Sequence, residues 1–167
     1  MSIATQPELV TRPAQPSVVI PVEASFSEWN RTIEAIPQII TWIEQNRIEP
    51  ASPLFYRYRR IGDQTRPFVV EIGFALHEPV AVPEPLTISE MEGGTYLTCL
   101  HQGHPDGIFD TSAQVMKWAQ ENGVKLDVST EGETEVWRGR YEFFLTNPDE
   151  EPDPQKWEIK LAWLTRD

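Results

Sequence analysis

Residues 41–48 read TWIEQNRI, and residues 117–124 read KWAQENGV. Both stretches hold a tryptophan at the second position and an asparagine at the sixth, and they lie 76 residues apart. Apolar residues from Trp29 to Ile43 recur at helical spacing, so the first stretch ends an amphipathic helix. The sequence therefore predicts two helices that end in the same way.

Two further pairs of segments follow these helices in the same order. They are FYRY at 55–58 with YEFF at 141–144, and VEIGFAL at 70–76 with WEIKLAW at 157–163. The offset here is 86 to 87 residues, and the acidic stretch before Trp137 accounts for the difference. Three matches in one order indicate an internal repeat.

The repeat predicts an α+β fold in which two pseudo-symmetric strand–helix–strand–strand modules form a central groove. We expect a single domain over residues 1–167, with module one at about 8–80 and module two at about 84–166. A groove between two such units is a natural ligand site. The alternative is a plain α+β domain in which the similarity between the segments is accidental.

Local patterns predict the individual elements. Helices are expected over 27–46, where Pro37 predicts a kink or two pieces, and over 110–122. The polar, acidic stretch 125–135 is expected to be a loop. Strands are expected at 17–20, 54–60, 68–76, 86–91, 95–101, 137–145 and 157–164.

Composition excludes several classes of protein. The chain carries 14 basic and 26 acidic side chains, a net charge of −12, whereas nucleic-acid binders show a basic stripe. We interpret the basic cluster Arg57–Arg60 as a solvated strand edge, so direct nucleic-acid binding is not expected. The apolar runs are too short for a membrane span, and Cys99 alone forms no internal disulfide. The N-terminal residues lack a basic and apolar block, so a secretory signal is not expected. We expect a cytoplasmic protein with neutral or cationic partners.

Five stretches of the chain carry a family resemblance: EGGTY at 92–96, HQG at 101–103, WAQENG at 118–123, YEFFLTNP at 141–148 and WEI at 157–159. They resemble the GyrI-like small-molecule-binding family, which also provides the effector-binding domain of many AraC- and MerR-type regulators. After residue 103 the family usually continues with an aromatic residue, whereas this chain has HPDG at 104–107.

The resemblance implies a groove that binds a hydrophobic, often cationic molecule beside a glutamate, at the position of Glu142, without a cofactor. Some stand-alone members resemble hydrolases of strained cyclopropanoid compounds. In that case Glu142 would act as general base and Tyr56 would donate a proton. Others are gyrase-inhibitory proteins, which implies a protein partner. A complete transcription factor with a helix-turn-helix domain is not expected.

The position of Glu142 in its expected strand also makes it the first candidate for a functional residue. It lies mid-strand among aromatic residues, where acidic residues are disfavoured, and the alternative is a solvated residue on a strand edge. Alternation places Tyr56 with Tyr58, and Glu142 with Phe144, on common faces, and the repeat sets Tyr56 across the groove from Glu142. Aromatic faces around a carboxylate suit an organic cation. Core packing is the alternative for both tyrosines.

Three residues complete the predicted ligand-binding set: Trp137, Tyr96 and His101. Trp137 lies five residues before Glu142, so a bulge near Gly139 would be needed to turn it into the groove. No metal site is expected, because the histidines near the HPDG segment lie in a turn.

Overall fold

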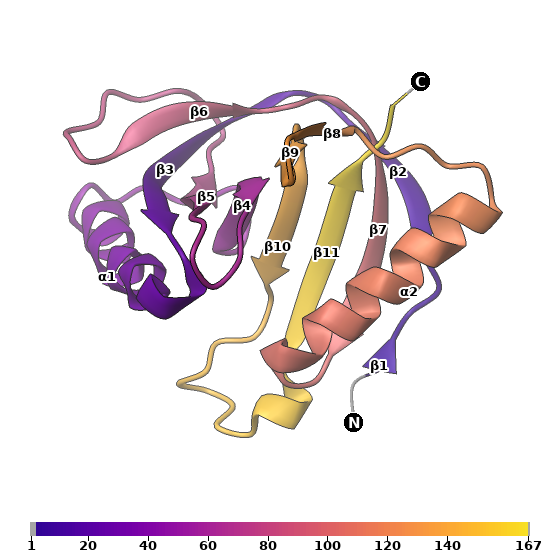
Figure 1. Ribbon diagram of the computed structural model, residues 1–167. Helices are drawn as coiled ribbons and strands as arrows, with labels where there is room; N and C mark the ends of the chain where they lie inside the picture. Colours follow the sequence, from indigo (N-terminus) through magenta and orange to yellow (C-terminus); the bar gives the residue numbers. More distant parts are fainter. Residues whose placement is uncertain (1–2, 167) are drawn as a thin grey trace.

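The computed structural model describes residues 3–166. Within these residues the chain forms two α-helices, α1 (Asn30–Gln45) and α2 (Ile108–Glu121), at the two ends of a strongly curled sheet (Figure 1). Short 3-10 segments lie at Phe26–Glu28, Pro105–Gly107 and Pro154–Lys156. The strands are β1 (Ile3–Ala4), β2 (Glu8–Arg12), β3 (Gln15–Ala24), β4 (Phe55–Ile61), β5 (Phe68–Ala75), β6 (Thr87–Met91), β7 (Gly94–Gln102), β8 (Val128–Glu131), β9 (Thr134–Trp137), β10 (Arg140–Phe144) and β11 (Glu158–Leu164). Neither helix of this described range is long and apolar enough to cross a bilayer.

The two halves of the sheet have the same strand order outward from the centre. Its strand order is β1-β7-β11-β10-β4-β5-β3-β6, and its pairings are antiparallel. The units β3–α1–β4–β5 and β7–α2–β10–β11 are the two pseudo-symmetric strand–helix–strand–strand modules, and each places its strands in the same order outward from the centre. The pseudo-two-fold axis passes between β4 and β10, where Glu142 pairs with Tyr56.

The modules exchange strands near their predicted boundaries. The early strand β2 pairs with β7 of the second module, and β6 pairs with β3 of the first. Hydrogen bonds therefore tie each module to a segment that the sequence analysis assigned to the other one. The boundaries at about residues 80 and 84 stay a prediction.

The two repeated tryptophan–asparagine segments form the same helix end. Asn46 and Asn122 each donate their backbone N–H to the carbonyl of the preceding tryptophan, Trp42 or Trp118. Their side-chain amides donate to the same carbonyls, at 2.9 and 2.8 Å. The next residue has a positive φ in both cases, 52° and 70°. The shared sequence therefore encodes a shared termination of α1 and α2.

The helix α1 is not divided at Pro37. It runs continuously over 16 residues, with Pro37 on its exposed side. The break between helical pieces lies earlier, at Trp29, which separates the 3-10 segment Phe26–Glu28 from α1.

The predicted loop at 125–135 is wrong. The strands β8 and β9 form a hairpin around Gly132, whose φ is 63°, and β9 pairs with the end of β4. Most side chains of this hairpin are exposed or half-buried, so it lacks the apolar alternation by which a strand is recognised. The predicted strand at 137–145 is likewise two strands, which Arg138 and Gly139 separate.

The interpretation of the basic cluster as a strand edge is also wrong. The strand β4 lies between β10 and β5, and the Arg57 side chain is only 1% exposed. Its guanidinium donates to the carbonyls of Glu90 and Arg138 at 2.8 and 2.7 Å, and it lies 3.6 Å from the Glu71 carboxylate. Arg57 is therefore a buried cation whose hydrogen bonds join β4 to β6 and to the segment before β10.

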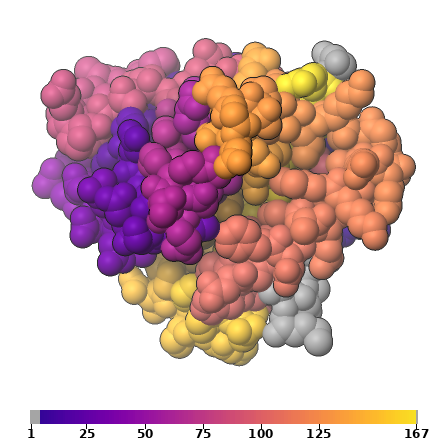
Figure 2. Space-filling view, in the orientation of Figure 1, coloured from indigo at the N-terminus to yellow at the C-terminus, as the bar shows by residue number. Residues whose placement is uncertain are grey.

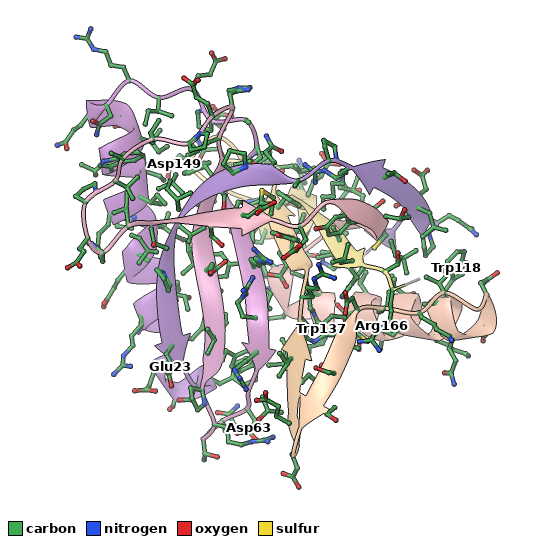
Figure 3. The ribbon with its side chains drawn as sticks, turned by 90° about the horizontal axis from the view of Figure 1, so that it is seen from above. Glu23, Asp63, Trp118, Trp137, Asp149 and Arg166 are labelled. Atoms are coloured by element: carbon green, nitrogen blue, oxygen red, sulfur yellow. The ribbon has the colours of Figure 1, made fainter. Side chains whose placement is uncertain are left out.

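The two faces of the sheet have different roles. On one face, residues of β3, β6 and β7 share a cluster with Phe55, Tyr141 and Phe143, although β3 and β7 are separated by four strands. The sheet therefore curls toward this face. On the opposite face α1 and α2 cover separate clusters, and they lie at opposite ends of the twisted sheet (Figure 3). Phe144 packs against both clusters, in the middle strands that neither helix covers.

Candidate functional site

A cavity of about 1170 Å³ lies between α1 and α2, over β4, β10 and β11. Figure 2 shows the molecule hollowed between the magenta atoms near the β4–β5 end and the salmon atoms of α2. Pockets for drug-sized ligands are commonly about 300–1,000 Å³, so this cavity is large enough for one. Its lining is mainly apolar and includes Phe26, Trp29, Ile33, Ile36, Ile40, Leu54, Tyr56, Tyr58, Phe68, Phe74, Ile108, Phe109, Phe144 and Trp157.

Glu142 lines the middle of this cavity. Its side chain is partly buried, and its Oε1 atom accepts a hydrogen bond of 2.9 Å from the Tyr58 hydroxyl. Burial raises the pKa of Glu142 to about 7, while the Tyr58 hydrogen bond and the charge of Arg140 lower it by less. Among residues 3–166, no nitrogen of a basic side chain lies within 4 Å of this carboxylate.

Aromatic rings form the wall beside Glu142. The rings of Trp29 and Tyr58 are stacked, with an interplanar angle of 8° and centroids 6.3 Å apart. Phe68 meets the Trp29 ring edge-on at 5.2 Å, and Phe144 meets the Tyr56 ring edge-on at 5.3 Å. These contacts fix the ring planes, so the wall is preorganised without a ligand.

The structure brings Tyr56, Tyr58, Glu142 and Phe144 together, with one difference from the expected geometry. Tyr56 and Glu142 are neighbours on paired strands and do not face each other across the cavity. The Tyr56 hydroxyl donates to the Thr32 hydroxyl at 3.2 Å, which ties β4 to α1, and burial raises the pKa of Tyr56 to about 12. The hydroxyl bonded to the carboxylate is therefore that of Tyr58.

The other three predicted residues do not line the cavity. Trp137 is 3% exposed within the cluster under α2, and Tyr96 lies on the opposite face, where its hydroxyl donates to the Glu92 carbonyl. His101 is fully buried, with one ring nitrogen 2.8 Å from the Thr111 hydroxyl and the other 3.1 Å from a backbone carbonyl. These positions are those of core residues. Across the described part of the chain, no group of three His, Cys, Asp or Glu side chains could hold a metal ion.

Trp29 and Arg140 are among the cavity residues that the sequence did not predict. Trp29 was assigned to the apolar side of a helix, whereas it stacks on Tyr58 in the cavity. Arg140 also lines the cavity, and alternation could have found it, because it lies two residues before Glu142 on the same strand.

Further carboxylates and the 3-10 segment before α2 complete the lining of the cavity. Glu44, Asp106, Asp149 and Glu158 all contribute to it, whereas Arg140 is its single basic residue in the part of the chain that the structure describes. The HPDG segment, where the chain departs from the family pattern, forms the 3-10 segment Pro105–Gly107 that leads into α2. Its Pro105 and Asp106 lie at the cavity in place of an aromatic side chain.

Solved structures share this fold. The C-terminal domain of EcmrR is 16% identical, with a TM-score of 0.71 over 97% of this chain and 98% of that domain. The EcmrR chain in a complex with DNA is 17% identical with a TM-score of 0.77, and this chain spans 57% of its length.

Two more distant structures are also similar. A hydrolase from Listeria innocua is 14% identical, with a TM-score of 0.63 over 96% of this chain and 92% of that one. SAV2435 bound to tetraphenylphosphonium is 9% identical, with a TM-score of 0.61 over 97% and 94%. At these identities the likeness shows the fold alone.

The sequence comparisons address the family directly. No curated protein sequence matches this chain. A family model described as the GyrI-like small molecule binding domain matches residues 5–163, which is nearly the whole chain. The protein therefore belongs to the GyrI-like small-molecule-binding domain family.

Proposed function

We propose that the cavity binds hydrophobic or cationic aromatic compounds beside Glu142. A single observation carries this proposal: a carboxylate lines a large, mainly apolar cavity, and no basic side chain of residues 3–166 lies within 4 Å of it. Removing an ionised carboxylate from water costs free energy unless a partner compensates. A bound cation would supply that partner.

The aromatic wall supports a delocalised or bulky cation over a small hydrated one. The stacked rings of Trp29 and Tyr58 present π faces near the carboxylate, and a cation near such a ring gains about 0.5–2 kcal/mol. The net charge of −12 also attracts cations to the molecule over a longer range. Binding of tetraphenylphosphonium by SAV2435, which shares the fold, agrees with a ligand of this class.

Titration with tetraphenylphosphonium and with the uncharged triphenylphosphine oxide tests this function. Trp29 lies in the cavity, so tryptophan fluorescence at pH 8 reports occupancy. We expect Glu142→Gln to weaken binding of the phosphonium about tenfold and to spare the neutral compound, because only the charge interaction is lost. The matched control is Glu34→Gln, which removes an exposed glutamate of α1.

Two results would contradict the proposal. One is equal weakening of both compounds by Glu142→Gln, which would mean that the carboxylate shapes the cavity without recognising charge. The other is that the wild-type protein binds neither compound below about 1 mM, which is an affinity of about −4 kcal/mol.

A second candidate function is hydrolysis of strained electrophilic compounds. The pKa of about 7 would let Glu142 act as general base near neutral pH, and the Tyr58 hydroxyl at 2.9 Å replaces Tyr56 as the group beside it. Styrene oxide is a suitable probe, since hydrolysis adds water across its ring to give a diol. Diol formation that Glu142→Gln abolishes supports this function, and formation that the substitution leaves unchanged removes Glu142 from it. A gyrase-modulating role with a protein partner stays a prediction.

A further inference from the structure

Arg140 places a positive charge in the same cavity as Glu142. It begins β10, lines the cavity, and lies two residues from Glu142 on the same face of the strand. Its side chain is 17% exposed, and its guanidinium lies over the Trp137 ring, 4.7 Å from the ring centroid. Trp137 thus contributes to the cavity indirectly, as the platform that orients Arg140.

The guanidinium of Arg140 has no hydrogen-bond acceptor among the described residues. Its nearest carboxylate is that of Glu135, at 3.8 Å between Nη1 and Oε1, and this Oε1 atom already accepts from the Trp137 ring nitrogen at 3.0 Å. Arg140 and Glu142 are more than 4 Å apart, so they do not neutralise each other in contact. The N–H donors of Arg140 reach the open space of the cavity and are free to donate to a ligand there.

Arg140 and Glu142 place opposite charges on one face of β10. Residues two apart on a strand are about 6.6 Å apart along its axis, so one ligand with two charged groups can contact both side chains. A guanidinium suits a carboxylate because its N–H groups form a planar fork that can donate two parallel hydrogen bonds.

We infer that Arg140 forms an anion subsite beside Glu142, so that the cavity prefers aromatic compounds that bear a carboxylate together with a positive charge. This inference rests on the proposed function, because Glu142 must hold the cationic part. The carboxylates of Glu44, Asp106, Asp149 and Glu158 also line the cavity, so the anionic group of such a ligand has one favourable position in it, at Arg140.

A matched pair of dyes tests the subsite. Rhodamine 110 has a xanthylium cation and a free carboxylate, and rhodamine 123 is its methyl ester with the same cation. Fluorescence anisotropy gives the dissociation constant of each dye for the wild type, Arg140→Gln, Arg140→Lys and Glu142→Gln. Lys117→Gln is the control for loss of a positive charge, since Lys117 lies on α2 with a side chain 77% exposed.

The measured quantity is the ratio of the two dissociation constants. We expect Arg140→Gln to shift this ratio against rhodamine 110 by about tenfold or more, through loss of charge-assisted hydrogen bonds. Arg140→Lys keeps the charge but not the fork, so its shift is smaller, and Lys117→Gln leaves the ratio unchanged. Glu142→Gln weakens both dyes alike, because both carry the cation.

The outcomes separate this inference from the proposed function. If Glu142→Gln weakens both dyes while Arg140→Gln leaves their ratio unchanged, the anion subsite is overturned and the proposed function stands. If Arg140→Gln tightens both dyes equally, Arg140 acts as a repulsive charge and the subsite is again overturned. If the wild type binds neither dye, the proposed function fails and takes the subsite with it.

Discussion

Replacing Glu142 with glutamine removes a partly buried negative charge. The raised pKa of Glu142 determines whether this replacement stabilises the protein more at high or at low pH. The pKa of Glu142 is about 7 in the folded protein, compared with an ordinary value of 4.5, because burial disfavours the charged form. The folded protein therefore binds this proton more tightly than the unfolded chain does. The stability that the protonated group provides is complete below about pH 4.5 and is lost as the pH rises through 7.

The magnitude follows from the two pKa values. A difference of one in pKa corresponds to about 1.4 kcal/mol, so the wild type loses about 3 kcal/mol between these limits. The carboxylate is partly exposed to the water of the cavity, which reduces the expected loss to about 2 kcal/mol. Glutamine does not ionise, so the stability of Glu142→Gln relative to the wild type should rise by about 2 kcal/mol between pH 4.5 and pH 8.

Urea unfolding monitored by tryptophan fluorescence measures this difference. The wild type and Glu142→Gln are compared at pH 4.5 and at pH 8, with Glu34→Gln as the control for loss of an exposed negative charge. The reasoning is refuted if the relative stability of Glu142→Gln is the same at both pH values, or if it is higher at pH 4.5.

Three other outcomes are expected. Binding of tetraphenylphosphonium should weaken about fivefold from pH 8 to pH 6, because Glu142 becomes mostly protonated and the protonated form binds the cation about tenfold more weakly. Tyr58→Phe should move the midpoint of this change to higher pH, because it removes a hydrogen bond that lowers the pKa of Glu142; fluorescence titrations measure both effects. Asn46→Ala and Asn122→Ala should each destabilise the protein by about 1 kcal/mol in urea unfolding, because each amide bonds the carbonyl of a repeated tryptophan, and a clear inequality would count against equivalent helix ends. Gly73→Ala should lower stability by about 3 kcal/mol or more in thermal unfolding, because a Cβ there would lie 1.8 Å from a backbone oxygen of β3, and an unchanged midpoint would disprove that close approach.

The sequence predicted the architecture because the decisive signals are local. Alternating apolar residues mark β5 and β11, and the tryptophan–asparagine segments mark the ends of α1 and α2. Their repetition in one order implied two similar modules, and a pseudo-two-fold brings equivalent strands together at the centre. Glu142 could be singled out for the same reason, since a carboxylate among aromatic residues in a strand departs from the local preference.

The remaining features depend on contacts between distant segments. From the sequence alone Arg57 resembles a surface residue, because its hydrogen-bond acceptors lie in β6 and in the segment before β10, far away in the chain. The β8–β9 hairpin is defined by its pairing with β4, which polar side chains do not reveal. Tyr58 and not Tyr56 bonds Glu142, because Tyr56 bonds Thr32 of α1 instead. Strand alternation places both tyrosines on one face but cannot assign their hydroxyl partners.

A crystal structure of the protein with tetraphenylphosphonium tests the central claim most directly. We predict that the cation lies in the cavity between α1 and α2, against the rings of Trp29 and Tyr58, with its charged centre nearer to the Glu142 carboxylate than to any other carboxylate. A cation bound elsewhere on the molecule, or bound in this cavity with its charged centre away from Glu142, would contradict the account.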